Sequence, residues 1–130
     1  MEKKATATSY TLYTETGSWL GQIVLTSDGM FVSVTDWGNL SYIWRSFGTD
    51  FREFILSLNV PYFSNKLATG MAYIAYSRAI DRRCDNFAER ILPALQKAIR
   101  LELDTESRLN TADIVGKCAN CGVEFHIHNL

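Results

Sequence analysis

The stretch WLGQIVLTSDGMFVSVTDW, residues 19–37, decides the fold class of this chain. Two apolar runs, rich in valine and other β-formers, flank Ser27, Asp28 and Gly29, which are typical of a tight turn. A turn this short cannot hold the crossover that a parallel pair of strands needs. The two runs are therefore predicted to form an antiparallel hairpin.

The neighbouring residues repeat this pattern. Before the hairpin, TATSYTLYT alternates and ends at a Thr-Gly-Ser turn, and after it Gly38 and Asn39 lead into LSYIWRSF. Four short runs joined by such turns are typical of an antiparallel meander. Residues 5–47 are predicted to form a four-stranded meander.

Helical patterns follow the strands. Asp50 and Glu53 have the spacing of a capping box, and Asn59 and Pro61 are predicted to end the helix that they begin. The residues from 72 to 100 then carry one apolar stripe at helical spacing: Tyr73, Tyr76, Ile80, Cys84, Phe87, Ile91, Leu95 and Ala98. Cys84 is in register with this stripe and is predicted to be a core residue.

Pro93 lies inside the long pattern and predicts either a kink or two abutting helices. The polar residues after Leu103 are predicted to be a loop or a short helical turn. A meander and an amphipathic helix must each cover an apolar face, so the sequence predicts an α+β fold with the helices on one face of the sheet. Residues 1–115 are expected to form this domain, with the helices over 50–103, and residues 116–130 a separate tail.

Composition narrows the class of function. The 130 residues carry a net charge of -1, with no strongly basic half, which argues against a protein that mainly grips a phosphate backbone. No run approaches the roughly 20 apolar residues of a membrane span, and no apolar segment follows the N-terminal lysines as in a secretory signal. Three cysteines, two of them in a C-x-x-C, favour a reducing, cytoplasmic setting.

The tail GKCANCGVEFHIHNL, residues 116–130, predicts a metal site. A C-x-x-C turn brings two thiolates onto one tetrahedral ion, and two histidines at i and i+2 of an extended strand point to the same side. Cys118, Cys121, His126 and His128 form a closed set that suits a structural Zn²⁺. Free thiols without metal are the first alternative, and redox chemistry is the second.

The nine residues CANCGVEFH resemble the first three ligands of the retroviral-type CCHC zinc knuckle. This resemblance implies zinc and, more weakly, binding of single-stranded nucleic acid. The chain departs from the family in two ways. The fourth ligand of the family would fall beyond Leu130, and Phe125 stands where the family has a small residue.

Two surfaces are predicted to contact a partner. The first is an arginine-bearing helix face with Arg78, Arg82, Arg83 and Arg90, whose alternative is a solvated face laced with weak ion pairs to neighbouring carboxylates. The second is the strand with Tyr42 and Trp44. These aromatic residues are exposed if Ile43 faces the core, and they are core if they face the helices.

No nucleophile, base and orienting group can be assembled from this sequence, so a non-enzymatic protein is expected. Residues 19–67, including DWGNLSYIWRSFGTDFREFILSL and YFSNKL, resemble a group of small accessory proteins of phages and prophages. The resemblance implies action inside a bacterium by binding a host or defence-system protein, as an inhibitor resembling anti-CRISPR proteins. The alternative is a single-stranded nucleic-acid binder that uses the tail and the arginine-bearing helix.

Overall fold

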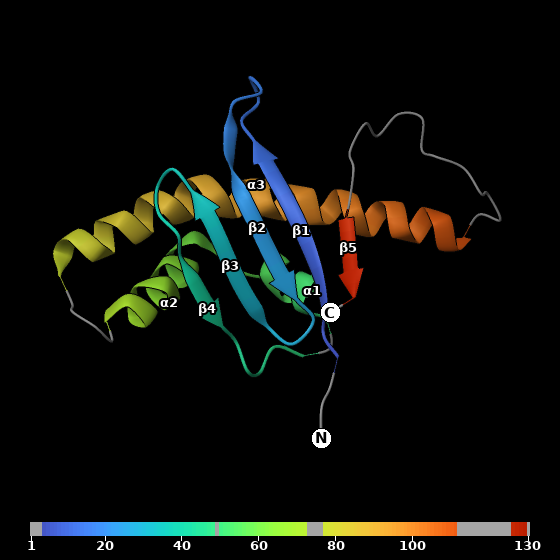
Figure 1. Ribbon diagram of the computed structural model, residues 1–130, viewed down its shortest axis with the longest axis horizontal. Helices are drawn as coiled ribbons and strands as arrows, with labels where there is room; N and C mark the ends of the chain where they lie inside the picture. The colour runs from blue at the N-terminus through green and yellow to red at the C-terminus, as the bar shows by residue number, and fades with distance from the viewer. Residues whose placement is uncertain (1–3, 49, 73–76, 112–125, 130) are drawn as a thin grey trace.

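The computed structural model describes residues 4–48, 50–72, 77–111 and 126–129. Its sheet holds the four predicted strands in chain order, β1 (Thr6–Tyr13), β2 (Trp19–Thr26), β3 (Met30–Thr35) and β4 (Ser41–Ile43), each antiparallel to the next. A fifth strand, β5 (His126–Asn129), pairs antiparallel with β1, which gives the order β4-β3-β2-β1-β5. The predicted meander is confirmed, and part of the tail joins its edge (Figure 1).

The turn between β2 and β3 depends on Gly29. This glycine has a φ of +100°, and a Cβ placed on it would lie 2.0 Å from the carbonyl oxygen of Trp44. The Trp44 amide in turn donates a 2.9 Å hydrogen bond to the Gly29 carbonyl. Only glycine tolerates both the backbone conformation and the close approach, so this residue fixes the turn.

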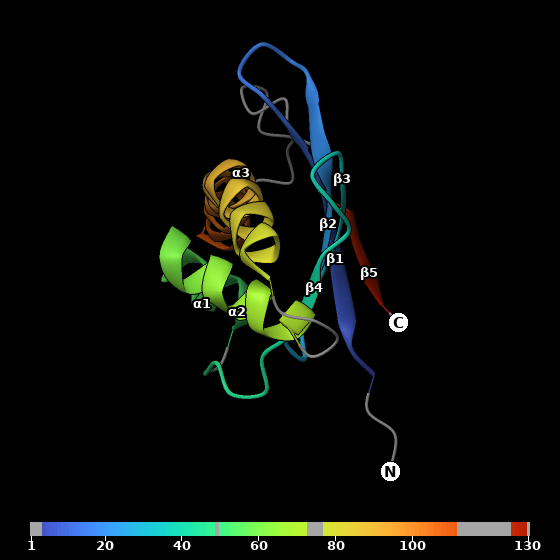
Figure 2. The same cartoon turned by 90° about the vertical axis from the view of Figure 1, so that its left-hand side faces the viewer.

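Three helices form a single layer on one side of the sheet (Figure 2): α1 (Phe51–Leu56), α2 (Val60–Ala72) and α3 (Arg78–Thr111). The α+β class and the one-sided packing are as predicted. The α1 helix starts at the predicted cap, where Asp50 accepts a 2.9 Å hydrogen bond from the Arg52 amide.

The α2 helix was not predicted. Asn59 and Pro61, expected only to end a helix, also begin this one, because the Asn59 side chain accepts a 2.8 Å hydrogen bond from the Tyr62 amide. Proline is tolerated in a first turn, where its missing N–H has no helical partner anyway. Phe63 and Leu67, four residues apart, then face the core, and this spacing was the signal in the sequence.

The α3 helix differs from the prediction at both ends. It begins at Arg78, runs through Pro93 without a break into two helices, and continues past Leu103 to Thr111. Residues 73–76 at the start of the predicted stripe lie outside the described residues. Pro93 and Glu89 are exposed, so water can reach the carbonyl that the proline leaves without its helical donor.

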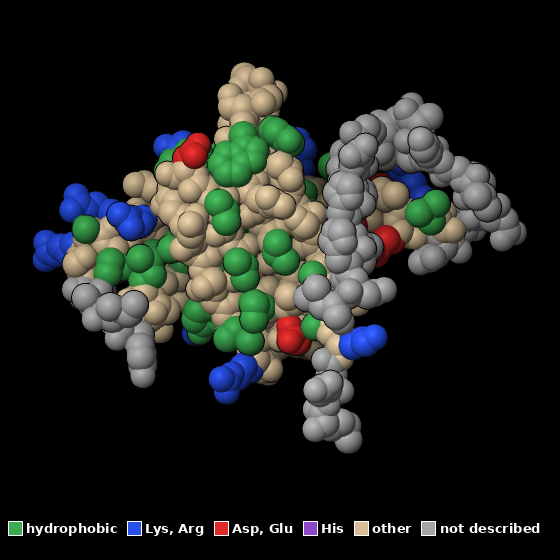
Figure 3. Space-filling view, in the orientation of Figure 1, with side chains coloured by type: hydrophobic (Ala, Val, Ile, Leu, Met, Phe, Trp, Pro, Cys, Tyr) green, Lys and Arg blue, Asp and Glu red, His purple; other side chains and the backbone are tan. Residues whose placement is uncertain are grey.

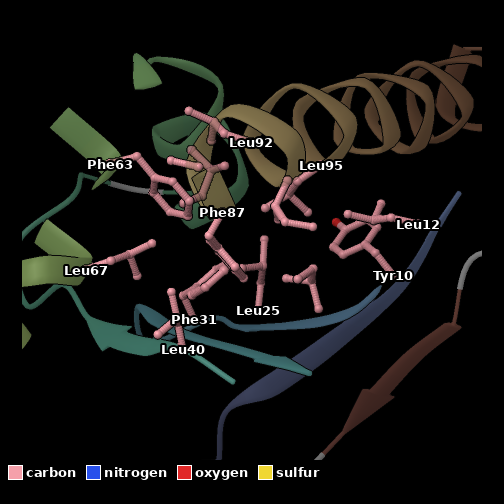
Figure 4. Packing of buried hydrophobic residues seen from close by; sticks show 14 of the residues in the cluster. Tyr10, Leu12, Leu25, Phe31, Leu40, Phe63, Leu67, Phe87, Leu92 and Leu95 are labelled. Carbon is pink, nitrogen blue, oxygen red and sulfur yellow. The ribbon is translucent and has the colours of Figure 1, made fainter. Parts of the chain in front are cut away.

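The core lies between the sheet and the helix layer (Figure 4). At its centre Phe31 packs edge-to-face against Phe63 and Phe87, with ring centroids 5.2 and 6.2 Å apart. Cys84 is fully buried on α3, which confirms its predicted core position. The buried hydrophobic residues of α3 follow the predicted stripe and add its flank: Cys84, Phe87, Ala88, Ile91, Leu92, Leu95 and Ile99.

Candidate interaction surfaces

The β4 strand presents Ile43 and not its aromatic neighbours to solvent. Ile43 is 44% exposed, whereas Trp44 is 5% exposed. Trp44 stacks on Phe63 at 6.3 Å, and Tyr42 lies half-buried with its ring 4.5 Å from that of Trp44. Of the two alternatives for Tyr42 and Trp44, the structure has the one in which they face the helices. The prediction that Trp44 is an exposed contact residue is therefore wrong, because the alternation of side chains places both rings on the core side of the sheet.

The side of the sheet that faces away from the helices carries several exposed apolar side chains, with polar residues such as Ser9, Thr11 and Gln22 between them. Its exposed and half-exposed hydrophobic residues, which we call the open face, are Tyr13, Trp19, Val24, Met30, Val32, Val34 and Ile43. Six of them form cross-strand pairs, Tyr13 with Trp19, Val24 with Val32 and Met30 with Ile43, whereas Val34 pairs with Gln22. Figure 3 shows hydrophobic side chains spread over this side of the sheet. Exposed apolar side chains gathered on one face of a sheet mark it as a candidate contact surface.

The open face follows from the alternation of side chains along each strand. In MFVSVT, Phe31, Ser33 and Thr35 are buried while Met30, Val32 and Val34 are exposed. Because β-branched residues occur at both buried and exposed positions of this strand, the periodicity of the sequence does not show which side is exposed to solvent.

The arginine-bearing helix face lies at the end of α3 where the helix begins, and Figure 3 shows lysine and arginine side chains gathered at this end. Arg78, Arg82, Arg83 and Arg90 are all exposed. Arg82 and Arg83 line an open hollow of about 650 Å³ between α3 and the loop after β3. The other residues that line the hollow are Asp36, Trp37, Gly38, Ala79 and Asn86.

The hollow combines two arginines, one carboxylate (Asp36) and one aromatic ring. The Arg90 guanidinium lies 5.0 Å from the centroid of the Trp37 ring, a cation–π contact. Within residues 77–111 and the other described segments, no ion pair joins any of the four arginines to a carboxylate. The alternative reading, in which these arginines form weak ion pairs with neighbouring carboxylates, is therefore not found in the described segments.

A third feature is a charged cluster that spans α1, α3 and β1. Arg52 forms ion pairs with Asp50 at 3.1 Å, with Glu106 at 2.8 Å and with Glu102, which is 1% exposed. The Tyr10 hydroxyl donates a hydrogen bond to Glu102. Burial, and then that hydrogen bond, raise the pKa of Tyr10 above its usual value, so the phenol stays protonated.

This cluster borders a pocket of about 240 Å³ lined by Thr6, Thr8, Leu25, Thr26, Ser27, Asp50, Phe51, Arg52 and Glu106. Arg52 is already bound by carboxylates. Burial works to lower the pKa of its guanidinium, but the hydrogen bonds to Glu106, Asp50 and Glu102 outweigh burial and leave that pKa above its usual value. The cluster therefore holds elements together, and its single cation is not free for a ligand.

Only two of the four predicted zinc ligands lie within the described residues. Cys118 and Cys121 lie outside the described residues. His126 and His128 lie on β5, opposite Ser9 and Ala7 of β1. In the remainder of the described chain, no group of three or more His, Cys, Asp or Glu side chains is placed to hold a metal ion. The Zn²⁺ site at these four residues stays a prediction.

No described helix has the length and apolar content needed to cross a membrane. No curated protein matches the chain, and neither does any solved structure. A family model described as a phage family matches residues 1–83, which include β1 to β4, α1, α2 and the first residues of α3. Since this match covers more than half of the 130 residues, the chain belongs to this phage family.

Proposed function

We propose that this phage-family protein is a non-enzymatic binding module that inhibits a bacterial defence protein by engaging an acidic segment of it. The observation that carries the proposal is the arginine hollow, which we define as Trp37, Arg82, Arg83 and Arg90. Its three arginines are exposed, and none of them forms an ion pair among the described residues. Arg82 and Arg83 line the concave surface, and Arg90 lies beside it against the Trp37 ring. A partner that supplies carboxylates would complete these contacts.

The chemistry of arginine supports an acidic protein surface as the partner. A guanidinium stays charged at any physiological pH and can bind a carboxylate through two parallel hydrogen bonds. Trp37 adds a rigid aromatic surface, and arginine and tryptophan are the residues most enriched at the energetic centre of protein interfaces. The phage family supplies the context, because a phage protein meets bacterial proteins.

The function test is phage growth. We expect that removing this protein from a phage that encodes it lowers plating efficiency on bacteria with an active defence system and not on bacteria without one. The double variant R82E/R83E should behave like the deletion, because reversed charges repel an acidic partner. Equal plating on both hosts after deletion contradicts the inhibitor function.

The matched control is Arg100→Glu. Arg100 is exposed on the same helix, and at 1.5 Å per residue it lies roughly 26 Å along the axis from Arg83. This variant changes the net charge of α3 in the same direction, but it is remote from the hollow. Loss of function by Arg100→Glu would mean that overall charge matters and not the hollow.

Single-stranded nucleic acid is the second candidate partner. The Arg90–Trp37 contact favours it, because aromatic and arginine planes are the platforms on which unpaired bases stack. Titration of a labelled single-stranded oligonucleotide decides the point. Binding that weakens linearly in log–log form with salt, and that R82E/R83E abolishes, would favour nucleic acid over the acidic protein segment.

A further inference from the structure

The pocket beside the Arg52 cluster carries an excess of negative charge. Two of its lining residues, Asp50 and Glu106, are carboxylates, and Arg52 is the one cation among the lining residues. The Arg52 guanidinium also binds a third carboxylate, Glu102, so three anions share a single positive charge. Partly buried charges are screened by salt less than exposed ones. The imbalance therefore favours a cation in this pocket over an anion.

One hydroxyl group of the pocket is buried without a hydrogen-bond partner. Thr8 is only 8% exposed, and its side chain makes no hydrogen bond to any described residue. Alternation along β1 points this side chain to the core side, where its cross-strand partner Leu25 also lines the pocket. The other buried hydroxyl of the lining, on Thr26, donates to Asp28. Because an unpaired buried hydroxyl is unfavourable, the Thr8 hydroxyl indicates a ligand that pairs with it.

The size and lining of the pocket narrow the class of cation. Its volume of about 240 Å³ is below the roughly 300–1,000 Å³ of pockets that take drug-sized ligands, so it suits one side chain or a small molecule. Leu25 and Phe51 add apolar carbon to the polar lining, which suits a ligand with an aliphatic stem. A metal ion fits less well, because no group of three or more His, Cys, Asp or Glu side chains in the described chain is placed to hold one.

We propose that this pocket binds a primary alkylammonium group, with the ammonium at the carboxylates and the Thr8 hydroxyl and the aliphatic stem against Leu25 and Phe51. An ammonium has three N–H donors and no acceptor, and Asp50, Glu106 and the Thr8 hydroxyl are acceptors in the lining. The group comes either from a free aliphatic amine or from a lysine side chain of another protein, since both present the same chemistry.

The pocket is remote from the arginine hollow. At 1.5 Å per residue, Glu106 lies roughly 35 Å along the α3 axis from Arg83. The two sites also have opposite charge, because the hollow presents arginines and the pocket an excess of carboxylates. Occupation of the pocket therefore leaves the hollow open, and the two sites can be tested separately.

The experiment is an NMR titration of the isotope-labelled full chain with n-butylammonium chloride at constant ionic strength. We expect saturable shifts of the Thr8, Phe51 and Arg52 amides, with a Kd on the order of 1 mM for a ligand of so few atoms. The uncharged n-butanol, which has nearly the same shape, should bind at least about tenfold more weakly, because it lacks the attraction of the carboxylates.

Matched variants locate the site. Thr8→Val removes the hydroxyl and keeps the shape, so it should fold as the wild type does and weaken butylammonium binding by about three- to tenfold. Thr11→Val, the same change at an exposed position of β1, should leave binding unchanged. Glu106→Gln should weaken binding by about tenfold, whereas Glu89→Gln, the same change of charge at a remote exposed position of α3, should not.

Absence of saturable shifts overturns the proposal, because the pocket then holds only water. Binding that n-butanol matches, or that Thr8→Val leaves unchanged, overturns it as well. If Glu106→Gln does not fold, Thr8→Val alone decides the point. Tighter binding of putrescine than of butylammonium supports the proposal and assigns a free amine, whereas tighter binding of Nα-acetyl-lysine methylamide supports it and assigns a lysine of a protein. No defence protein is needed, so the outcome is independent of the proposed function.

Discussion

At the scale of single residues, the buried carboxylate of Glu102 accounts for features that neither charge nor periodicity indicated. Glu102 receives the Tyr10 hydroxyl from β1 and the Arg52 guanidinium from α1. A carboxylate that is 1% exposed would be costly without such partners. The Glu102 side chain therefore links α3 to β1 and to α1, which are far apart in the sequence.

Glu102→Ala should lower the free energy of unfolding by about 3–5 kcal/mol, because it leaves Arg52 and the Tyr10 hydroxyl without their buried partner. Glu102→Gln keeps the shape and one acceptor, and should cost less. Asp104→Ala is the control, since it removes only an exposed Arg108 pair and should change stability by less than about 0.5 kcal/mol. Urea titration measures all three, and an equal effect of Asp104→Ala would contradict this role of Glu102.

Asp50 gives a pH dependence with a definite sign. Burial works to raise the pKa of Asp50, but the hydrogen bonds and charge of Arg52 outweigh it and leave that pKa lower than in the unfolded chain. The stabilisation is thus fully present above the unfolded value, about pH 3.9, and is lost as pH falls through the lower folded value. Asp50→Asn keeps the helix cap but has no charge. Its stability should fall less steeply in this acid range than that of the wild type, as measured by urea titration at stepped pH.

At the scale of elements, α3 is longer than its apolar stripe because its last turns are stabilised by ion pairs to α1 and by one ion pair within the helix. Glu102 and Glu106, one turn apart, both bind Arg52, and Asp104 pairs with Arg108 at 3.1 Å. Earlier in the helix, the Gln96 amide donates to the carbonyls of Ile55 at 3.0 Å and Leu58 at 2.9 Å, which closes the end of α1. The ion pairs after Leu103 stabilise as helix a segment that the sequence predicts to be a loop or a short helical turn.

Pro93→Ala should raise stability, because an alanine at this exposed position restores the backbone hydrogen bond to Glu89 in a helix that is already continuous. The expected gain is about 1–3 kcal/mol, or a rise in melting temperature of several degrees. Lys97→Ala, also exposed on α3, is the control and should have little effect. A lower melting temperature for Pro93→Ala would mean that the helix needs a bend at this residue to cover the sheet.

At the scale of the whole molecule, the residues matched by the family model include α1 and α2 but only the first residues of α3. Residues 1–83 hold four strands and two helices, but the apolar stripe of α3 from Cys84 to Ile99 lies beyond them. A fragment of residues 1–83 should therefore not fold, because the core side of the sheet would lose its main cover. Circular dichroism and proton NMR check this against a 1–111 fragment, which keeps all of α3 and is expected to fold. A folded 1–83 fragment would show that α3 is an addition to a core that is already sufficient.

The tail carries the metal prediction. Protein made with zinc supplied should hold about one zinc per chain, and chelation should leave the helical signal intact, because the sheet and helices have their own core. Cys118→Ser with Cys121→Ser should abolish zinc binding, while Cys84→Ala, which changes the buried thiol, should not. Elemental analysis without zinc, or zinc retained by the double serine variant, would end the hypothesis.

Local signals in the sequence were sufficient for the class of fold. Short glycine-bearing turns determined the antiparallel meander, and the spacing of Cys84, Phe87 and Ile91 determined which side of α3 is buried, because both depend on backbone geometry within a few residues. The sequence also marked the arginine face. Tertiary structure alone decided that Trp44 is buried and Ile43 is exposed. Alternation assigns these residues to opposite sides of the strand, and only the packing of the helix layer determines which side is buried. Tertiary structure alone also brought Trp37 to Arg90 and Glu102 to Arg52 and Tyr10, because such pairs join residues whose separation along the chain carries no periodic signal.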